Sequence, residues 1–376
     1  MASETKIQLP VIDISSATAE VGKQVIDAAR QYGFLYIDTA SSCFSKEEID
    51  STFKMVLSIS LSIPGKPSIC KSITDVYLDT QTNPTQAQEF FASPIEEKKE
   101  VEIRSDNMGW TAMHKETLDP EHQQRGDFKE AINFGEFKNN KASQPLPKSL
   151  VPHEEDLNRF TSLCQKTCAR ILTLLALGLD IPDNWFSSRH DASHGPSGST
   201  LRFLYYPSLR CPSTQSFQHG VDVRAGAHSD YGSITLLFQR DGQPGLEILT
   251  PAGTWAGVPV RPAGVSSSAS NAPPILVNIG DLLSYWTRGV LKSTVHRVVF
   301  AKDEEEESEG RDRYSIVYFC HPCHDTELVA VPSSIVEGVS NSEGAVGGEK
   351  LVTAGEHLAN RLAATYGKSV GAYYRD

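Results

Sequence analysis

The spacing of apolar residues changes from a helical repeat to a strand-like one part-way along the chain. Apolar side chains recur at positions 157, 160, 164, 168, 171, 175 and 179, and these steps place them on one face of a single helix. Gly178 and Pro182 mark its end. Earlier, positions 21, 25, 26 and 29 predict a shorter helix between strands at 9–14 and 34–37. Ser45 and Glu48 form a capping box, so another helix is expected from about residue 46.

From residue 199 onward, short β-rich runs alternate with Gly, Pro, Asn and Asp. The predicted strands are 201–206, 233–238, 246–249, 275–278, 282–286, 294–300 and 314–319. Many short strands at near-regular spacing are typical of a sandwich or barrel. Thr353 and Glu356 form a second capping box, which predicts a closing helix over 354–366. Two polar inserts, 265–271 and 303–312, are expected to be solvated hairpin loops.

Composition places the chain among ordinary globular proteins. Its 376 residues are 39% hydrophobic and 22% charged, which excludes a mainly disordered or collagen-like chain. The net charge of -12 argues against nucleic acid or an anionic membrane as a partner. The longest apolar stretch, 171–179, is too short to span a membrane, and no secretory signal is visible. Seven cysteines suit free thiols, so we expect a soluble cytoplasmic protein with no obligate protein partner indicated.

The segment from Cys320 to His324 spells CxxCH, a pattern of covalent haem attachment and also half of a zinc site. No second CxxC completes a zinc site. The favoured interpretation is therefore the end of a strand followed by a turn.

The sharpest chemical signal is His228-Ser229-Asp230 followed by His296. Residues two apart in a strand share a face, and two His with one carboxylate is the ligand set that non-haem Fe(II) uses when positions must stay open. The pattern is short enough to arise by chance, and the chain has two rivals, His114-Lys115-Glu116 and His153-Glu154-Glu155. Both rivals lie in polar surroundings and are expected on solvated faces.

Arg313 and Ser315 begin the last β-rich run and share a face with Val317 and Phe319. A guanidinium with a hydroxyl two residues along is suited to holding a carboxylate. The alternative is a salt bridge from Arg313 to a core Asp or Glu.

Four segments together resemble one enzyme family: 227–237, 278–281, 292–298 and 313–315. They are similar to the isopenicillin N synthase-like branch of the Fe(II)/2-oxoglutarate dioxygenases, and 9–13 is similar to the start of that family's N-terminal region. The resemblance implies a mainly β fold with α-helices: a double-stranded β-helix, or jelly roll, over 199–376 with a C-terminal helix. The helix-rich region 1–198 is then expected to pack on this barrel.

The resemblance also implies roles for individual residues. His228, Asp230 and His296 are the expected iron ligands, while Arg313 and Ser315 are expected to hold the distal carboxylate of 2-oxoglutarate. Tyr206 matches a family tyrosine near this co-substrate, although Leu204 stands where many plant members carry Asn. The implied cofactor is Fe(II), with 2-oxoglutarate and O2 as co-substrates.

The implied activity is the oxidation, most simply the hydroxylation, of a C–H bond of a small-molecule metabolite, as in secondary metabolism, with release of succinate and CO2. Two alternatives remain open: an Fe(II) oxidase of the same fold that takes no 2-oxoglutarate, and a catalytically silent binding protein. No separate acid or base residue is proposed, because the chemistry belongs to the iron centre.

Substrate contacts are the least determined part of the site. Phe319 is a candidate for stacking on a ring substrate, or else a core aromatic, and Arg202 is a candidate partner for an anion or carbonyl, or else a surface residue. The segment 123–137, with Gly126 and Gly135, is a candidate lid.

Overall fold

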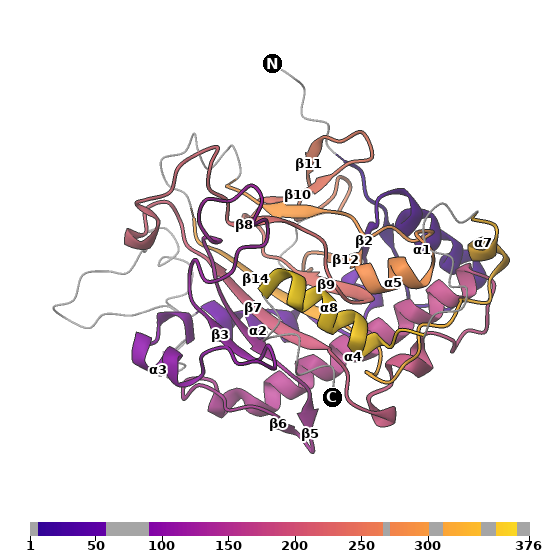
Figure 1. Ribbon diagram of the computed structural model, residues 1–376, viewed down its shortest axis with the longest axis horizontal. Coiled ribbons are helices and arrows are strands. Elements are labelled where there is room, and N and C mark those ends of the chain that lie inside the picture. Colours follow the sequence, from indigo (N-terminus) through magenta and orange to yellow (C-terminus); the bar gives the residue numbers. More distant parts are fainter. Residues whose placement is uncertain (1–6, 58–89, 266–270, 301–310, 340–350, 367–376) are drawn as a thin grey trace.

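Two sheets form the centre of the molecule (Figure 1). The computed structural model describes residues 7–57, 90–265, 271–300, 311–339 and 351–366. In these ranges the larger sheet has eight strands in the order β1-β2-β12-β9-β14-β7-β4-β3. Its strands are β1 Val11–Ile12, β2 Phe34–Ile37, β3 Gly109–Thr111, β4 Glu130–Phe134, β7 Thr200–Tyr206, β9 Ile234–Phe238, β12 Ile275–Ile279 and β14 Arg313–Cys320.

The smaller sheet has four strands in the order β11-β10-β13-β8. These are β8 Ala225–His228, β10 Leu246–Leu249, β11 Trp255–Gly257 and β13 His296–Val298. A further hairpin pairs β5 Phe137–Lys138 with β6 Lys141–Ala142. Buried side chains of both sheets, among them Tyr206, Ile248 and Val317, pack in one cluster, so the space that holds the cavity described below lies between the sheets.

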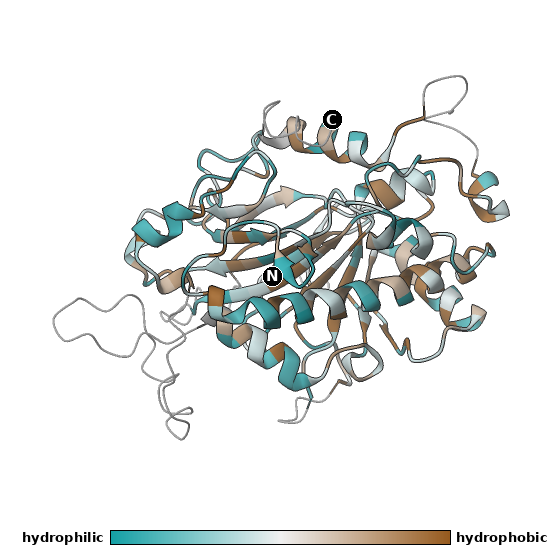
Figure 2. Cartoon of the chain, turned by 90° about the horizontal axis from the view of Figure 1, so that it is seen from below, coloured by the Kyte–Doolittle hydropathy of each residue, from teal (hydrophilic) through white to brown (hydrophobic). Residues whose placement is uncertain are grey.

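Helices cover the other face of the larger sheet. They include α1 Ala19–Gln31, α2 Lys46–Leu57 and α4 Glu154–Gly178, and Figure 2 shows their hydrophilic sides turned outward from the hydrophobic strands. α1 and α4 approach closely at Gly22 and Gly178, where a Cβ on Gly178 would lie 2.3 Å from the Gly22 carbonyl oxygen. The remaining helices are α3 Ile95–Glu100, α5 Asp281–Trp286, α7 Ser334–Glu337 and α8 Ala354–Tyr366.

Most of the predicted elements are confirmed. The long helix, the two capping boxes and the closing helix are present: Ser45 and Glu48 exchange backbone–side-chain hydrogen bonds at the start of α2, and Thr353 and Glu356 do so at α8. The polar inserts lie largely outside the described residues, at 266–270 and 301–310. Within the described ranges, no helix has the length and apolar character needed to cross a membrane.

Two expectations are wrong. Residues 282–286, predicted as a strand, form α5, because the Leu282 amide donates to the carbonyls of Tyr231 and Gly232 and so anchors the start of a helix. Leu282, Leu283 and Trp286 lie on its buried side. The candidate lid at 123–137 contains β4, which pairs with β3 and β7 inside the larger sheet. Phe128 and Phe134 are buried there, so this part of the segment is core rather than cover.

Candidate active site

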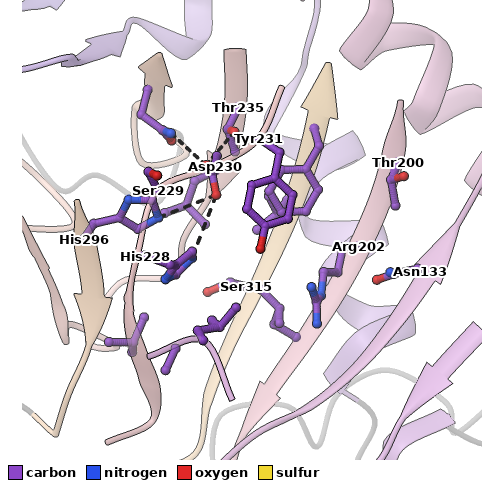
Figure 3. Close-up of a pocket in the computed structure, with 18 of the residues that line it drawn as sticks. Asn133, Thr200, Arg202, His228, Ser229, Asp230, Tyr231, Thr235, His296 and Ser315 are labelled. Atoms are coloured by element: carbon purple, nitrogen blue, oxygen red, sulfur yellow. Dashed lines mark hydrogen bonds and ion pairs between the residues drawn. The ribbon is translucent and has the colours of Figure 1, made fainter. Parts of the chain in front are cut away.

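Three predicted ligand residues converge between the sheets. His228 ends β8 and His296 begins β13, where the two residues face each other in the strand register, and Asp230 follows in the turn after β8. The Asp230 Oδ1 atom lies 3.9 Å from His228 Nε2 and 3.7 Å from His296 Nε2 (Figure 3). In the described part of the chain, this is the one group of three or more His, Cys, Asp or Glu side chains arranged to hold a metal ion.

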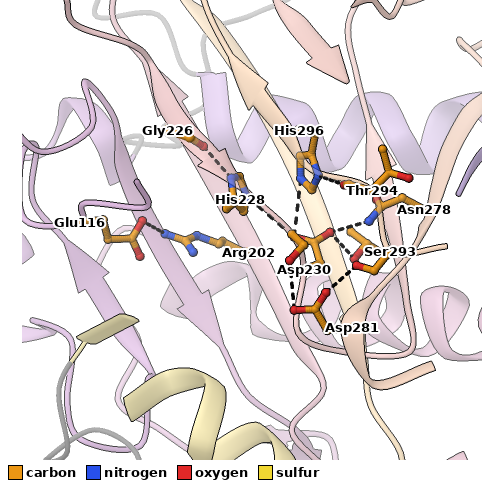
Figure 4. A network of polar contacts seen from close by, with 12 residues as sticks. Glu116, Arg202, Gly226, His228, Asp230, Asn278, Asp281, Ser293, Thr294 and His296 are labelled. Carbon is orange, nitrogen blue, oxygen red and sulfur yellow. Dashed lines mark hydrogen bonds and ion pairs between the residues drawn. The ribbon is translucent and has the colours of Figure 1, made fainter. Parts of the chain in front are cut away.

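Each of the three side chains is oriented by a further contact. The Nδ1 atoms of His228 and His296 lie 2.7 Å from Gly226 O and 3.1 Å from Thr294 O, which leaves both Nε2 atoms facing Asp230 (Figure 4). Thr235 Oγ1 and Asn278 Nδ2 both donate to Asp230 Oδ2 at 2.7 Å. Asp230 therefore directs its other oxygen, Oδ1, toward the two imidazoles. Thr235 and Asn278 are functional contacts that the sequence analysis did not identify.

The local environment keeps His228 and Asp230 in metal-binding form. Burial and the neighbouring His296 lower the pKa of His228 to about 3, so the imidazole is neutral near pH 7. Burial of Asp230 opposes its ionisation, but His296, His228 and the hydrogen bonds from Asn278 and Thr235 together lower the pKa of this carboxyl. Two imidazoles and a carboxylate, with no thiolate among them, fit Fe(II) with coordination positions left open.

Arg313 and Ser315 lie in the same cavity as the three side chains. Arg313 is 1% exposed, its Nη2 lies 3.5 Å from Gln239 Oε1, and its guanidinium carbon lies 5.0 Å from the centre of the Tyr206 ring. The Ser315 hydroxyl is buried and makes no hydrogen bond with the described residues. A buried guanidinium beside an unsatisfied hydroxyl is suited to a carboxylate ligand.

Comparison with known proteins decides the family. The profile of the 2OG-Fe(II) oxygenase superfamily matches residues 197–322, and that of the non-haem dioxygenase in morphine synthesis N-terminal region matches 81–154. The 2-oxoglutarate-dependent dioxygenase ecdK of Aspergillus rugulosus is 30% identical over 67% of this chain and 76% of its own length. The chain belongs to the 2OG-Fe(II) oxygenase superfamily.

Other relatives extend the likeness over almost the whole chain. A UPF0676 protein of Schizosaccharomyces pombe is 33% identical over 96% of this chain and 94% of its own length. Among solved structures, a full-length Neurospora crassa protein in complex with alpha-KG and thymine has a TM-score of 0.68 and 26% identity, and covers 97% of this chain and 99% of that one. This 2OG-Fe(II) oxygenase is thus a non-haem Fe(II)/2-oxoglutarate-dependent dioxygenase, an oxidoreductase that uses O2.

The other end of the oxygenase cavity is lined by side chains from β4, β7 and β14. Asn133, Thr200 and Arg202 lie across it from Asp230 in Figure 3, and Phe319 also lines it. Arg202 is 8% exposed, so its interpretation as a surface residue is wrong. Strand register places Arg202 between Asn133 and Val317, because β7 pairs with both β4 and β14.

In the rival His114-Lys115-Glu116, the first two residues are exposed as expected, but the expectation is wrong at Glu116. Glu116 is 3% exposed and accepts from Arg202 Nη2 at 2.6 Å. The opposing charge of a distant strand explains its burial, and no local pattern signals that pairing. His153, in contrast, lies on a partly exposed helix start beside Asp156, as expected.

The CxxCH segment follows the favoured interpretation. Cys320 is the last residue of β14, and the Cys323 thiol donates to the Asp191 carbonyl at 3.2 Å. His321 turns back to line the cavity, and its Nδ1 is buried without a hydrogen bond to the described residues.

Proposed function

We propose that His228, Asp230 and His296 hold Fe(II) and that Arg313 and Ser315 bind the distal carboxylate of 2-oxoglutarate, with Tyr206 beside it. The observation that carries this assignment is the convergence of two imidazole Nε2 atoms on Asp230 Oδ1 in the cavity that Arg313 and Ser315 line. The spacing along β14 supports it, because Arg313 and Ser315 project from one face of the strand into that cavity.

The reaction we propose is hydroxylation of a small-molecule metabolite. A substrate C–H, O2 and 2-oxoglutarate give C–OH, succinate and CO2, with one oxygen atom of O2 in each oxidised product. Bound Fe(II) supplies activation of O2. The chain's own residues orient the metal ligands, fix the co-substrate at its far carboxylate, and line a cavity between the sheets that limits stray oxidation.

For the substrate end we propose Arg202 and Phe319 as contacts. Phe319 is only partly buried within the cluster between the sheets and lines the cavity, which suits stacking on a flat ring. The relative from Neurospora crassa, crystallised with thymine, supports a ring-shaped substrate.

The finer architecture is also a proposal. We propose that the two sheets form the double-stranded β-helix expected for 199–376 and that 1–198 is an accessory region, although β2 and β4 join the larger sheet. A cytoplasmic site of action on a small molecule, without nucleic acid, membrane or obligate protein partner, fits the buried cavity and the net charge of -12.

The test is anaerobic reconstitution with Fe(II), followed by addition of 2-oxoglutarate and measurement of the weak visible charge-transfer band. We expect the band in the wild type, no band in Asp230→Ala, and a weaker band at equal 2-oxoglutarate in Arg313→Ala. Arg261→Ala is the matched control, because that arginine pairs with Asp241 outside the cavity.

Iron binding without a band would favour the Fe(II) oxidase that takes no 2-oxoglutarate. Failure of the wild type to bind iron would remove both enzymatic interpretations and leave a binding protein. Once a substrate is found, succinate formed in step with product completes the assignment.

A further inference from the structure

Four ionisable side chains lie buried beside the substrate end of the cavity. Glu116, Asp127, Lys129 and Arg202 are between 0% and 8% exposed. Lys129 Nζ lies 2.5 Å from Asp127 Oδ2 and 3.0 Å from Glu116 Oε2, and Arg202 Nη2 lies 2.6 Å from Glu116 Oε2. The four residues, which we name the charge quartet, form one connected network.

The charges of the quartet cancel. Burial opposes ionisation of Glu116, but Arg202 and Lys129 hold the pKa of its carboxyl well below its usual range. Burial likewise opposes the charge on Lys129, yet Asp127 and Glu116 raise the pKa of its ammonium. Asp127 Oδ1 accepts from Gln123 Nε2 and from the Gly226 amide, which completes its contacts as a carboxylate. Two cations therefore meet two anions.

The cations of the quartet face the cavity, and the anions stand behind them. Lys129 and Arg202 are among the lining residues, whereas Figure 4 shows Glu116 on the far side of Arg202 from His228. A lining arginine whose charge is already matched offers hydrogen-bond donors without a net charge to neutralise. This part of the lining, formed by Lys129, Arg202 and Asn133 and named here the wall, therefore suits the oxygen of a carbonyl better than a carboxylate.

Asn133, which lines the cavity, has a side-chain oxygen that can accept a hydrogen bond from a ligand. Asn133 is 1% exposed and its Nδ2 donates to Asn107 O at 2.8 Å, while its Oδ1 makes no hydrogen bond with the described residues. Asn133 lies directly opposite Arg202 in the register of β4 and β7. An acceptor and a donor thus stand side by side on this wall, as an amide edge requires.

Two further cations of the described residues lie near the cavity and already have partners or proposed partners. Arg313 is assigned to 2-oxoglutarate above, and Arg361 of α8 lies 2.6 Å from Asp281 Oδ2. A substrate carboxylate placed at the Arg202 end would be a buried anion that competes with Glu116 for its partner, and such a charge is costly.

We infer that the substrate is an uncharged molecule with an amide- or lactam-type edge, its N–H donated to Asn133 Oδ1 and its carbonyl accepting from Arg202, and not a carboxylic acid. This inference rests on the proposed function for the location of the substrate end. It names Glu116 as a residue that sets specificity by holding Arg202 in a neutral pair.

The experiment compares benzamide with benzoate, two probes of nearly equal shape that differ in charge. Binding to the anaerobic Fe(II) protein with saturating 2-oxoglutarate is measured by calorimetry, and the charge-transfer band is recorded in the same samples. We expect the wild type to bind benzamide at least about tenfold more tightly than benzoate. Glu116→Gln, which leaves one excess positive charge, is expected to shift the ratio at least about tenfold toward benzoate.

Two further variants make the test specific. Glu116→Gln with Arg202→Gln restores the charge balance and is expected to remove the gain for benzoate. Glu247→Gln, which removes the carboxylate of the Arg297 ion pair, is the control and is expected to keep the wild-type ratio. Asp127→Asn makes the same change of net charge as Glu116→Gln and replaces it if that variant does not fold.

Benzoate binding to the wild type as tightly as benzamide would overturn the inference, and so would a Glu116→Gln protein with no gain for benzoate. In one outcome of the experiment, neither probe binds the wild type measurably. In that case, benzoate binding to Glu116→Gln supports the inference, and absence of benzoate binding to Glu116→Gln overturns it. The band separates the two proposals, because a normal band with the wrong probe preference refutes only the charge argument, whereas a missing band refutes the proposed function.

Discussion

Replacement of Thr235 by Val is expected to weaken iron binding although Thr235 is not a ligand. Its hydroxyl donates to Asp230 Oδ2 at 2.7 Å, and Asn278 Nδ2 donates to the same atom at the same distance. Together they direct Asp230 Oδ1 toward His228 and His296. Without the hydroxyl, the carboxylate has one anchor and is free to rotate away from the arrangement that faces both imidazoles.

The magnitude follows from the kind of hydrogen bond that is lost. A hydrogen bond to a charged group contributes about 1.5–3 kcal/mol, and loss of a contact behind a metal ligand commonly weakens metal binding about 10- to 100-fold. Thr235 is 4% exposed and valine has nearly the same shape, so no cavity opens. Because Asn278 still holds Oδ2, the lower end applies, and we expect the dissociation constant for Fe(II) to rise about tenfold.

The assay is anaerobic titration calorimetry with Fe(II) in the absence of 2-oxoglutarate. Thr200→Val is the matched control: Thr200 is a buried threonine lining the same cavity, but its hydroxyl donates to Gly198 O at 3.1 Å. The control is expected to keep the wild-type dissociation constant. Asn278→Ala should weaken binding at least as much as Thr235→Val.

An opposite electrostatic effect makes this a sharp test. A donor on Asp230 Oδ2 draws electron density from the carboxylate, so its removal alone would strengthen the metal bond. Unchanged or tighter Fe(II) binding in Thr235→Val would therefore refute the argument that orientation dominates.

Three other outcomes are expected. Arg313→Lys should raise the KM for 2-oxoglutarate about tenfold or more, because an ammonium replaces a guanidinium that can donate two parallel hydrogen bonds. An unchanged KM in a succinate assay would contradict the proposed binding of 2-oxoglutarate by Arg313. Burial and the neighbouring His357 lower the pKa of His321 from 6.5 to about 3, so only the unfolded chain binds this proton at intermediate pH. The metal-free protein should therefore lose up to about 1.4 kcal/mol of unfolding free energy per pH unit as pH falls through that window. In His321→Gln, the free energy of unfolding measured with urea should fall less per pH unit between pH 6.5 and 4.5 than in the wild type. An equal fall would contradict this prediction. Gly178→Ala should lower the free energy of unfolding by about 1–3 kcal/mol, because the added Cβ collides with α1 at the α1–α4 contact. The control is Gly257→Ala, where a Cβ meets no atom within 4 Å, and equal urea unfolding of the two variants would contradict this prediction.

The elements that could be predicted are those whose residues carry a local signal. In each capping box, Ser45 with Glu48 and Thr353 with Glu356, the two residues hydrogen-bond with each other's backbone or side chain within the first helical turn. The local sequence is therefore sufficient to predict where each helix begins. The run at 282–286 has no such signal, since a short apolar stretch suits a buried strand and a buried helix equally. Its helical state depends on a non-local contact: the Leu282 amide donates to the carbonyls of Tyr231 and Gly232.

The same distinction separates the two ends of the cavity. His228 and Asp230 stand two residues apart, and Arg313 and Ser315 likewise, so short motifs place these pairs before any tertiary contact is known. Glu116 lies outside the strands and meets Arg202, 86 residues away, on β7, whose register with β4 sets Asn133 opposite Arg202. A carboxylate in a polar segment is indistinguishable from a solvated one until that register is known.

This difference separates the residues expected to set activity from those expected to set substrate preference. The proposed iron end consists of side chains fixed by motif spacing, and we expect changes there to remove activity. The proposed substrate end contains a network of opposite charges, and altering one member changes its net charge while leaving the proposed iron ligands in place; the members are Glu116, Asp127, Lys129 and Arg202. Substrate preference of this protein should therefore follow the sum of charges at this end of the cavity more closely than the identity of any single residue. We expect Arg202 to bind a carbonyl when Glu116 accompanies it and a carboxylate when Glu116 is removed.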